Sequence, residues 1–136
     1  MTADRSRMRE RLEAEQALIT RVFRTAVIDL DALVVIIKDH PLPEGWSHDV
    51  TDVLVVIPTN YPGGRPDNVC ARPDLRLADG KTPANTMGEH AYTARNWLQF
   101  SWHPEESQWR ATNDPAVGSN LLSYLLGAVK RFEEPS

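Results

Sequence analysis

The segment Tyr61-Pro62-Gly63-Gly64-Arg65-Pro66 is the most informative in the sequence. It belongs to a longer stretch, Pro58–Pro66, that holds three prolines and two glycines. Proline has no backbone N–H to donate, and glycine is the residue that best tolerates unusual backbone angles. The stretch is therefore a loop, and regular structure is expected on either side of it.

Short strands are expected on both sides of this loop, two before it and one after it. The runs Asp52–Ile57 and Ala32–Lys38 are rich in valine and isoleucine, which favour strands. The earlier run ends at Asp39-His40-Pro41, where the proline removes a donor from the ladder, and the turn-rich stretch Pro41–Ser47 follows. Two apolar strands joined by a loop of this length are most simply neighbours in an antiparallel meander. A shorter third strand is expected around Asn68–Arg72.

Helices are expected near both ends of the chain. Within the N-terminal segment 1–24, apolar residues recur at helical spacing over Ser6–Arg24, and the serine can cap the helix. A second amphipathic helix is expected over Ser119–Arg131, again capped by its serine. We expect one domain, residues 1–136, in which a helix, strands, a long loop and a helix follow one another. This order is typical of the α+β class with a small antiparallel sheet.

The segment 73–103 shows no clear periodicity. Its first part is polar and contains breakers at Gly80, Pro83 and Gly88. Loops of more than about 20 residues are uncommon in compact domains and are usually functional when ordered. We therefore expect 73–103 to be a long loop that carries the active-site segment. Aromatic residues then crowd into thirteen positions, at Trp97, Phe100, Trp102 and Trp109.

The composition excludes several classes of protein and site. The 136 residues carry a formal net charge of −4, which offers no footprint for a nucleic-acid partner. The longest apolar run, Leu33–Ile37, is too short to span a bilayer, and the polar N-terminus is unlike a secretory signal. A single cysteine, Cys70, excludes a disulfide within the chain and a cysteine-rich zinc site. With no HExxH, P-loop or Gly-x-Ser-x-Gly motif either, we expect a soluble cytoplasmic protein without metal, cofactor or membrane partner.

The order of these features resembles the ubiquitin-conjugating (UBC) fold. In that fold an N-terminal helix precedes a meander, a Tyr-Pro-x-x-x-Pro segment follows the strands, and a tryptophan precedes the central helix. Here Tyr61–Pro66 matches the segment and Trp109 matches the tryptophan. The loop Leu42–Gly45 and the stretch Trp97–Trp109 look more narrowly like a bacterial branch, the prokaryotic ubiquitin-conjugating-like family E. The resemblance covers about residues 30–133.

The resemblance also implies where the acceptor residue lies. In ordinary ubiquitin-conjugating enzymes a cysteine stands eight residues before that tryptophan, and eight residues before Trp109 is Ser101. The usual His-Pro-Asn triplet is missing, and about Pro73–Thr93 is extra length. Ser101 would then accept the C-terminus of a ubiquitin-like protein from an activating enzyme as an oxyester. Cys70 is the alternative nucleophile, although a free cysteine on a strand is usually buried and inert.

Two histidines are candidates to assist Ser101. A serine hydroxyl needs a base, and imidazole suits that task near neutral pH. If residues 100–103 are extended, Ser101 and His103 share one face, and the imidazole can act as base or oxyanion helper; if they are helical, the two side chains point apart. His90 is a second candidate base, and Asn96 with backbone amides near Ser101 are candidate donors to the oxyanion. The alternative is that Ser101 is a small loop residue and His103 a packing residue.

The resemblance implies protein partners, and the charge pattern suggests a docking surface. Residues 1–24 hold six arginines and four acids, a net charge of +2, whereas nine basic and fifteen acidic residues give the rest of the chain −6. The first helix of UBC enzymes commonly docks the activating enzyme. Arginines at every second position of a helix do not form one stripe, so not all of them can face the same partner. The implied contacts are Arg5, Arg7, Arg9 and Arg11; a solvated helix face is the alternative. The implied partners are a ubiquitin-like protein, the activating enzyme, a ligase-like protein that could complete the site, and a metal-dependent isopeptidase.

Two non-enzymatic alternatives share this pattern. Catalytically inactive UBC-like modules keep the Tyr-Pro-x-x-x-Pro segment, lose the cysteine, and bind a ubiquitin-like protein or a partner enzyme. An RWD-like interaction domain has no link to ubiquitin-like proteins. The enzyme hypothesis predicts an exposed Ser101 near an imidazole, and the binding modules require neither.

Overall fold

The fold combines two helices with an antiparallel sheet, in a computed structural model that describes residues 2–102 and 108–136 and the side chains from Ser6 onward. Along the chain the elements are α1 (Thr2–Val22), β1 (Val27–Asp29), β2 (Val34–Pro41), β3 (Val50–Val56), β4 (Asp67–Ala71), β5 (Thr86–Tyr92), β6 (Arg95–Phe100) and α2 (Leu121–Ala128). A short 3₁₀ helix, Val129–Glu133, follows α2. The predicted α+β class is confirmed, and the arrangement is that of a UBC-like fold.

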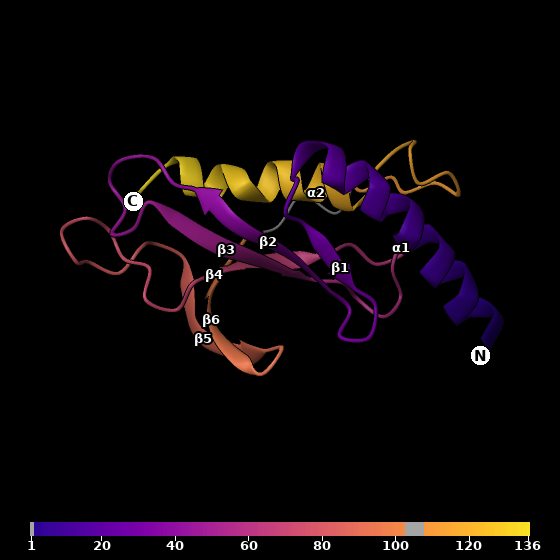
Figure 1. Cartoon of the computed structure of the whole chain (residues 1–136), viewed down its shortest axis with the longest axis horizontal. Coiled ribbons are helices and arrows are strands. Elements are labelled where there is room, and N and C mark those ends of the chain that lie inside the picture. The colour runs from indigo at the N-terminus through magenta and orange to yellow at the C-terminus, as the bar shows by residue number, and fades with distance from the viewer. Residues whose placement is uncertain (1, 103–107) are drawn as a thin grey trace.

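The strands form one sheet in the order β1-β2-β3-β4-β6-β5, and each neighbouring pair is antiparallel (Figure 1). The strands β2, β3 and β4 are the predicted meander, and β2 runs to Pro41, three residues beyond the predicted end at Lys38. The edge strand β1 was not predicted, because three residues are too few to show a periodic pattern.

The prediction that 73–103 is one long loop is wrong, because the segment contains the hairpin β5–β6. The edge strand β5 is mostly exposed, so its sequence is polar and shows no apolar alternation. The turn between the strands places Thr93 and Ala94 at φ 53° and 60°, where asparagine and glycine are the usual residues. No Asn-Gly or Asp-Gly signal therefore marks this hairpin in the sequence.

Both helices pack on one face of the sheet (Figure 1). In α1 the apolar side chains on the inner side, Leu12 among them, are buried because they recur at helical spacing. The opposite face of the sheet carries a smaller cluster in which Trp97 of β6 packs over the central strands. The sheet is thus covered on both faces near β6. The smaller cluster consists of Val34, Leu54, Cys70 and Trp97.

The helix α2 begins at a different cap from the predicted one. Asn120 accepts a hydrogen bond from the Ser123 amide at 2.8 Å, and the Ser123 hydroxyl accepts one from the Asn120 amide at 2.9 Å. This reciprocal capping box occupies the first turn. Ser119 instead accepts a hydrogen bond from the Arg110 amide at 2.8 Å, so it lies outside the helix. Within the described ranges, no helix has the length and apolar character that crossing a membrane requires.

Candidate functional site

Ser101, the predicted acceptor, directly follows the last residue of β6. Its amide donates a hydrogen bond of 2.8 Å to the carbonyl of Asn85, which lies just before β5. The residue is half-buried rather than fully exposed, and the chain at 101–102 is not helical. The backbone that carries the hydroxyl is thus tied to the neighbouring strand.

The next residue, Trp102, anchors this segment against α2 and β4. Its ring meets the ring of Tyr124 edge-on, with the centroids 5.0 Å apart. It also covers Gly127, where a Cβ would lie 2.7 Å from the indole, so only glycine fits without a shift. The carbonyl of Trp102 accepts a hydrogen bond of 3.0 Å from the Asn68 amide. The backbone around Ser101 is therefore held on two sides.

Arg131 supports the same segment from the C-terminal side. Its guanidinium carbon lies 5.0 Å from the centroid of the Phe100 ring, and its Nη2 donates a hydrogen bond of 2.9 Å to the carbonyl of Ala84. Ala84 immediately precedes Asn85, whose carbonyl accepts from the amide of Ser101. Arg131 thus contacts both chain segments that meet at the amide of Ser101.

The structure does not bring the other predicted helpers to Ser101. His90 pairs with Trp97 across the hairpin, so about four residues of strand, or roughly 13 Å, separate it from Ser101. Asn96 lies at the opposite end of β6, about 16 Å away on the same reasoning. The ring of His90 instead stacks on Tyr92, and its Nε2 lies 3.0 Å from the Met87 carbonyl. His103 lies outside the described residues, so its role stays a prediction.

Cys70, the alternative nucleophile, is buried in β4 within the smaller apolar cluster. Its sulfur lies 3.8 Å from the side-chain oxygen of Gln99, which also accepts a hydrogen bond from the Tyr92 hydroxyl at 3.0 Å. Burial raises the pKa of the Cys70 thiol to about 12. The nucleophilic thiolate is therefore scarce at neutral pH, which argues against a thioester on this residue.

Alkylation of Cys70 by iodoacetamide is expected to be at least 100-fold slower in the folded protein than in urea. A pKa of about 12 instead of the ordinary 9.0 leaves roughly a thousandth as much thiolate at pH 8. Below this raised pKa the thiolate fraction of the folded protein increases about tenfold per pH unit. The alkylation rate of folded Cys70 should therefore continue to rise about tenfold per pH unit to pH 10 and beyond. Intact mass measured over time at pH 8, 9 and 10 tests this. Folded and unfolded rates within a few-fold of each other would contradict it.

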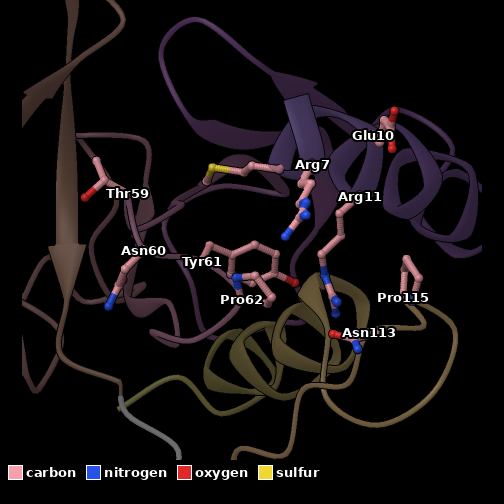
Figure 2. A pocket seen from close by; sticks show the side chains of 10 residues that line it. Arg7, Glu10, Arg11, Thr59, Asn60, Tyr61, Pro62, Asn113 and Pro115 are labelled. Carbon is pink, nitrogen blue, oxygen red and sulfur yellow. The ribbon is translucent and has the colours of Figure 1, made fainter. Parts of the chain in front are cut away.

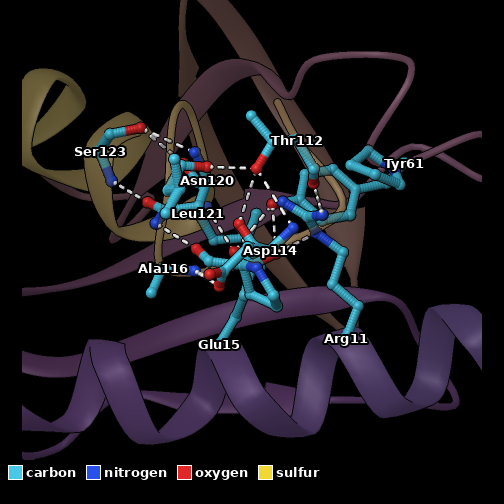
Figure 3. Close-up of polar contacts among 12 residues, drawn as sticks. Arg11, Glu15, Tyr61, Thr112, Asp114, Ala116, Asn120, Leu121 and Ser123 are labelled. Carbon is cyan, nitrogen blue, oxygen red and sulfur yellow. Dashed lines mark hydrogen bonds and ion pairs between the residues drawn. The ribbon is translucent and has the colours of Figure 1, made fainter. Parts of the chain in front are cut away.

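The Tyr-Pro loop meets α1 in a buried polar cluster that the sequence analysis missed (Figure 3). Glu15 has no exposed surface; its carboxylate accepts hydrogen bonds from the Tyr61 hydroxyl at 2.6 and 2.8 Å and from the Leu121 amide at 2.6 Å. Arg11 Nε donates to the same carboxylate at 2.8 Å, and its Nη1 donates to the Thr112 carbonyl. Burial, together with the Glu15 carboxylate, raises the pKa of Tyr61, so its hydroxyl stays a donor.

A signal for this cluster is present in the sequence of α1. Glu15 falls on the apolar stripe of the helix, three residues after Leu12 and four before Ile19. A carboxylate at such a position must be paired when it is buried, and Arg11 stands four residues before it. The pair Arg9–Glu13 has the same spacing but lies off the stripe, and both of its side chains are exposed.

Trp109 joins the Tyr-Pro loop to the chain that enters α2. Its indole Nε1 donates a hydrogen bond of 2.9 Å to the carbonyl of Pro62, and its ring lies 6.1 Å from that of Tyr61. The loop and the tryptophan are far apart in the sequence but in contact in the fold. Trp109 is thus held in place by the Tyr-Pro loop, and Ser101 lies eight residues before it in the sequence.

The arginines of α1 do not form the single set of partner contacts that the charge pattern indicates. The prediction for Arg11 is wrong, because its side chain is only 8% exposed and is held by Glu15. Arg7 is exposed, and Arg9 is exposed beside Glu13 at 3.4 Å. The side chain of Arg5 lies outside the described ones. Two of the four arginines therefore stand as accessible candidates for docking.

A comparison of the sequence with known families identifies a family whose model covers the Tyr-Pro loop, Trp109 and the start of α2. A family model described as Prokaryotic E2 family E matches residues 15–122. The chain belongs to this family. The matched range includes Tyr61–Pro66, Ser101 and Trp109. No curated protein and no solved structure matches the chain.

Membership of Prokaryotic E2 family E confirms the resemblance and gives the protein a ubiquitin-conjugating-like role. Proteins of this kind interact in general with a ubiquitin-like protein and with the enzyme that activates it. Ser101 lies eight residues before Trp109, the spacing at which ordinary conjugating enzymes have their cysteine, and its role as the acceptor stays a prediction. Among the side chains that the structure describes, no cluster of three or more His, Cys, Asp or Glu residues could hold a metal ion.

Proposed function

We propose that the protein is an acyl carrier that accepts the C-terminus of a ubiquitin-like protein on Ser101 as an oxyester. The observation that carries the proposal is the spacing of eight residues from Ser101 to Trp109. The indole of Trp109 donates a hydrogen bond to the carbonyl of Pro62 in the Tyr-Pro loop. Family membership and the two-sided support of the Ser101 backbone add to it. Burial of Cys70 disfavours the alternative thioester.

The transfer is a transesterification. Ser101 Oγ attacks the acyl carbon that the activating enzyme holds, so a C–O bond forms while the bond to the activating enzyme breaks. The leaving group takes the electron pair, and the serine proton passes to a base, for which we propose His103. An amine then attacks the oxyester, a C–N bond forms, the C–O bond breaks, and the serine hydroxyl is restored.

An oxyester is less electrophilic toward amines than a thioester, so the second step needs donors aimed at the developing oxyanion. The amide of Ser101 is already bonded to Asn85, and Asn96 lies at the far end of β6. We therefore propose that the oxyanion donors come from the chain after Ser101 or from a ligase-like partner. The activating enzyme would dock on α1 through Arg7 and Arg9 rather than through Arg11.

Replacing Ser101 with alanine is expected to abolish the adduct. The protein is incubated with its ubiquitin-like protein, the activating enzyme and ATP, and intact mass is measured beside Ser101→Ala and Cys70→Ala. The expected adduct is present in wild type and Cys70→Ala, is cleaved by hydroxide and resists thiol. An adduct lost only in Cys70→Ala would overturn the oxyester. If the partners bind without any adduct, the protein is an inactive UBC-like module instead.

A further inference from the structure

The guanidinium of Arg131 joins two chain segments that lie beside Ser101. Its Nη2 donates hydrogen bonds to the carbonyl of Ala84 at 2.9 Å and to the carbonyl of Ser136 at 3.3 Å. Its Nη1 donates to the carbonyl of Glu134 at 3.0 Å. The planar group presents its N–H donors at fixed angles, so this one side chain ties the loop before β5 to the C-terminal segment.

The same guanidinium packs against the aromatic ring that precedes Ser101. Its central carbon lies 5.0 Å from the centroid of the Phe100 ring and 5.6 Å from the centroid of the Trp46 ring. Both rings are buried, and they meet edge-on with their centroids 6.4 Å apart. Arg131 therefore contacts the covalent neighbour of Ser101 as well as the segment that binds the Ser101 amide.

The segment that accepts from the Ser101 amide has an unusual backbone at Asn85. This residue lies at φ 64°, in the left-handed region that favours glycine and that asparagine adopts more readily than most other residues. Its carbonyl accepts the 2.8 Å hydrogen bond from Ser101. A left-handed residue keeps its conformation when the surrounding structure holds it. The hydrogen bond from Arg131 to the Ala84 carbonyl gives that support, because it fixes the plane of the peptide unit directly before Asn85.

A second arginine packs on β6 at the opposite end of the strand. The guanidinium carbon of Arg95 lies 4.0 Å from the centroid of the Trp97 ring, and its Nη1 donates a hydrogen bond of 3.1 Å to the Asp52 carboxylate. Arg95 begins β6, whereas Ser101 directly follows the last residue of the strand, so about 20 Å of extended chain separates them. Arg95 is therefore a matched control: it makes the same kinds of contact on the same strand, away from Ser101.

We propose that Arg131 is a positioning residue for acyl transfer to Ser101. It holds the peptide unit before Asn85 and the ring of Phe100, and these two contacts fix the backbone from which the Ser101 hydroxyl projects. A displacement of about 1 Å at a reacting group can lower a rate about 100-fold. The inference rests on the proposed function, because it names a residue on which acylation of Ser101 depends. Arg131 acts through the chain around Ser101 and needs no contact with the ubiquitin-like protein or the activating enzyme.

Single-turnover kinetics test this role. Activating enzyme that already carries the ubiquitin-like protein is mixed with increasing concentrations of wild type or variant, and the adduct is followed by intact mass. For Arg131→Met we expect the maximal rate to fall about 10- to 100-fold, while the half-saturating concentration changes less than about twofold. Arg95→Met should change neither value by more than about twofold. An unchanged maximal rate in Arg131→Met, or an equal fall in Arg95→Met, would overturn the proposal.

Two further variants separate positioning from charge and from docking. Arg131→Lys keeps the positive charge but loses the planar group that reaches Ala84 and the Phe100 ring together, so its maximal rate should stay close to that of Arg131→Met. Arg7 lines a pocket between α1 and the Tyr-Pro loop (Figure 2) and belongs to the proposed docking contacts, so Arg7→Met should raise the half-saturating concentration instead. A wild-type rate in Arg131→Lys, or the pattern of Arg7→Met in Arg131→Met, would show that Arg131 acts through charge or docking and would contradict positioning.

Hydrogen exchange of the Ser101 amide tests the same contacts without any partner protein. In wild type this amide is bonded to the Asn85 carbonyl and should be protected from exchange. Arg131→Met should raise its exchange rate about tenfold or more, and Arg95→Met less than about twofold. Urea unfolding shows whether each variant is folded, and Arg131→Lys, which keeps an aliphatic stem, takes the place of Arg131→Met in every comparison if the latter is not.

The two measurements together distinguish this inference from the proposed function. If wild type forms no Ser101 adduct but the exchange of the Ser101 amide rises as expected, the proposed function fails and the positioning of the Ser101 backbone by Arg131 stands. If wild type forms the adduct and the Ser101 amide exchanges at the same rate in wild type and Arg131→Met, the positioning role fails and the proposed function stands.

Discussion

Replacing Glu15 with alanine is expected to lower the free energy of unfolding by about 3–5 kcal/mol. The carboxylate accepts hydrogen bonds from Arg11, Tyr61 and the first amide of α2. Its loss leaves a buried guanidinium without its counter-charge and two buried donors without acceptors, which is the costly way to break an ion pair. Urea unfolding followed by circular dichroism measures the difference, with the midpoint shifting while the slope stays constant.

The matched control is Glu13→Ala, two residues earlier on the same helix. Glu13 pairs with Arg9 at the same spacing, but the two side chains are 61% and 64% exposed. An exposed pair of this kind contributes about 0–1 kcal/mol. Both variants exchange glutamate for alanine within α1, so the change in helix propensity is the same in both. The difference between their losses in free energy of unfolding therefore measures the effect of burial. Equal losses in the two variants would show that the buried cluster does not hold α1 in place.

The cluster also connects the two regions that the proposed function uses. Glu15 joins α1 to the beginning of α2, and Tyr124 and Gly127 of α2 hold the ring of Trp102 next to Ser101. A partner that docks on α1 would therefore contact a helix that is hydrogen-bonded to α2, and α2 also supports the segment that carries Ser101. We expect Glu15→Ala to lower the yield of the ubiquitin-like protein adduct on Ser101 only in proportion to the fraction of protein that is unfolded.

Much of the fold could be predicted because its central strands and helices carry strong local patterns. The valine and isoleucine runs predict β2 and β3, and the spacing of Leu12 and Ile19 predicts the inner face of α1. The hairpin β5–β6 could not be predicted in the same way. Its edge strand buries little, so no periodicity records its role, and Thr93 and Ala94 make the turn without the usual residues.

The candidate site was less accessible to sequence reasoning than the fold. The prediction of Ser101 depends on its distance from a tryptophan that the family resemblance singles out, and no physical feature of the serine itself marks it. Arg11 differs from Arg7 in that it stands four residues before Glu15, a carboxylate on the apolar stripe of the helix, and in the fold Arg11 is buried against Glu15 and the Thr112 carbonyl whereas Arg7 is exposed. Cys70 was the easier case, since a strand position among apolar residues already predicts burial.

Replacing Ser101 with cysteine is expected to change the chemistry of the adduct. A thiol is ionised far more readily than a hydroxyl near neutral pH, so the cysteine should be acylated without a strong base. The product would be a thioester, which thiols cleave, in place of an oxyester, which resists thiols and is cleaved by hydroxide. Transfer from this thioester to an added amine should be faster than from wild type by about tenfold or more. Intact mass before and after thiol treatment, together with single-turnover transfer to free lysine, measures both effects.

The control places the same thiol elsewhere on the surface. Ser6 is exposed on α1, so Ser6→Cys offers an accessible cysteine outside the proposed site, and Cys70 stays in both variants because it is buried. If Ser101 occupies the acceptor position, only Ser101→Cys gains the thiol-labile adduct. A thiol-labile adduct of equal yield on both variants would show that any exposed thiol is acylated and that position 101 has no special geometry. A Ser101→Cys variant that binds the ubiquitin-like protein and the activating enzyme but carries no adduct would establish a binding module, because even a competent nucleophile at that position would not then reach the acyl carbon.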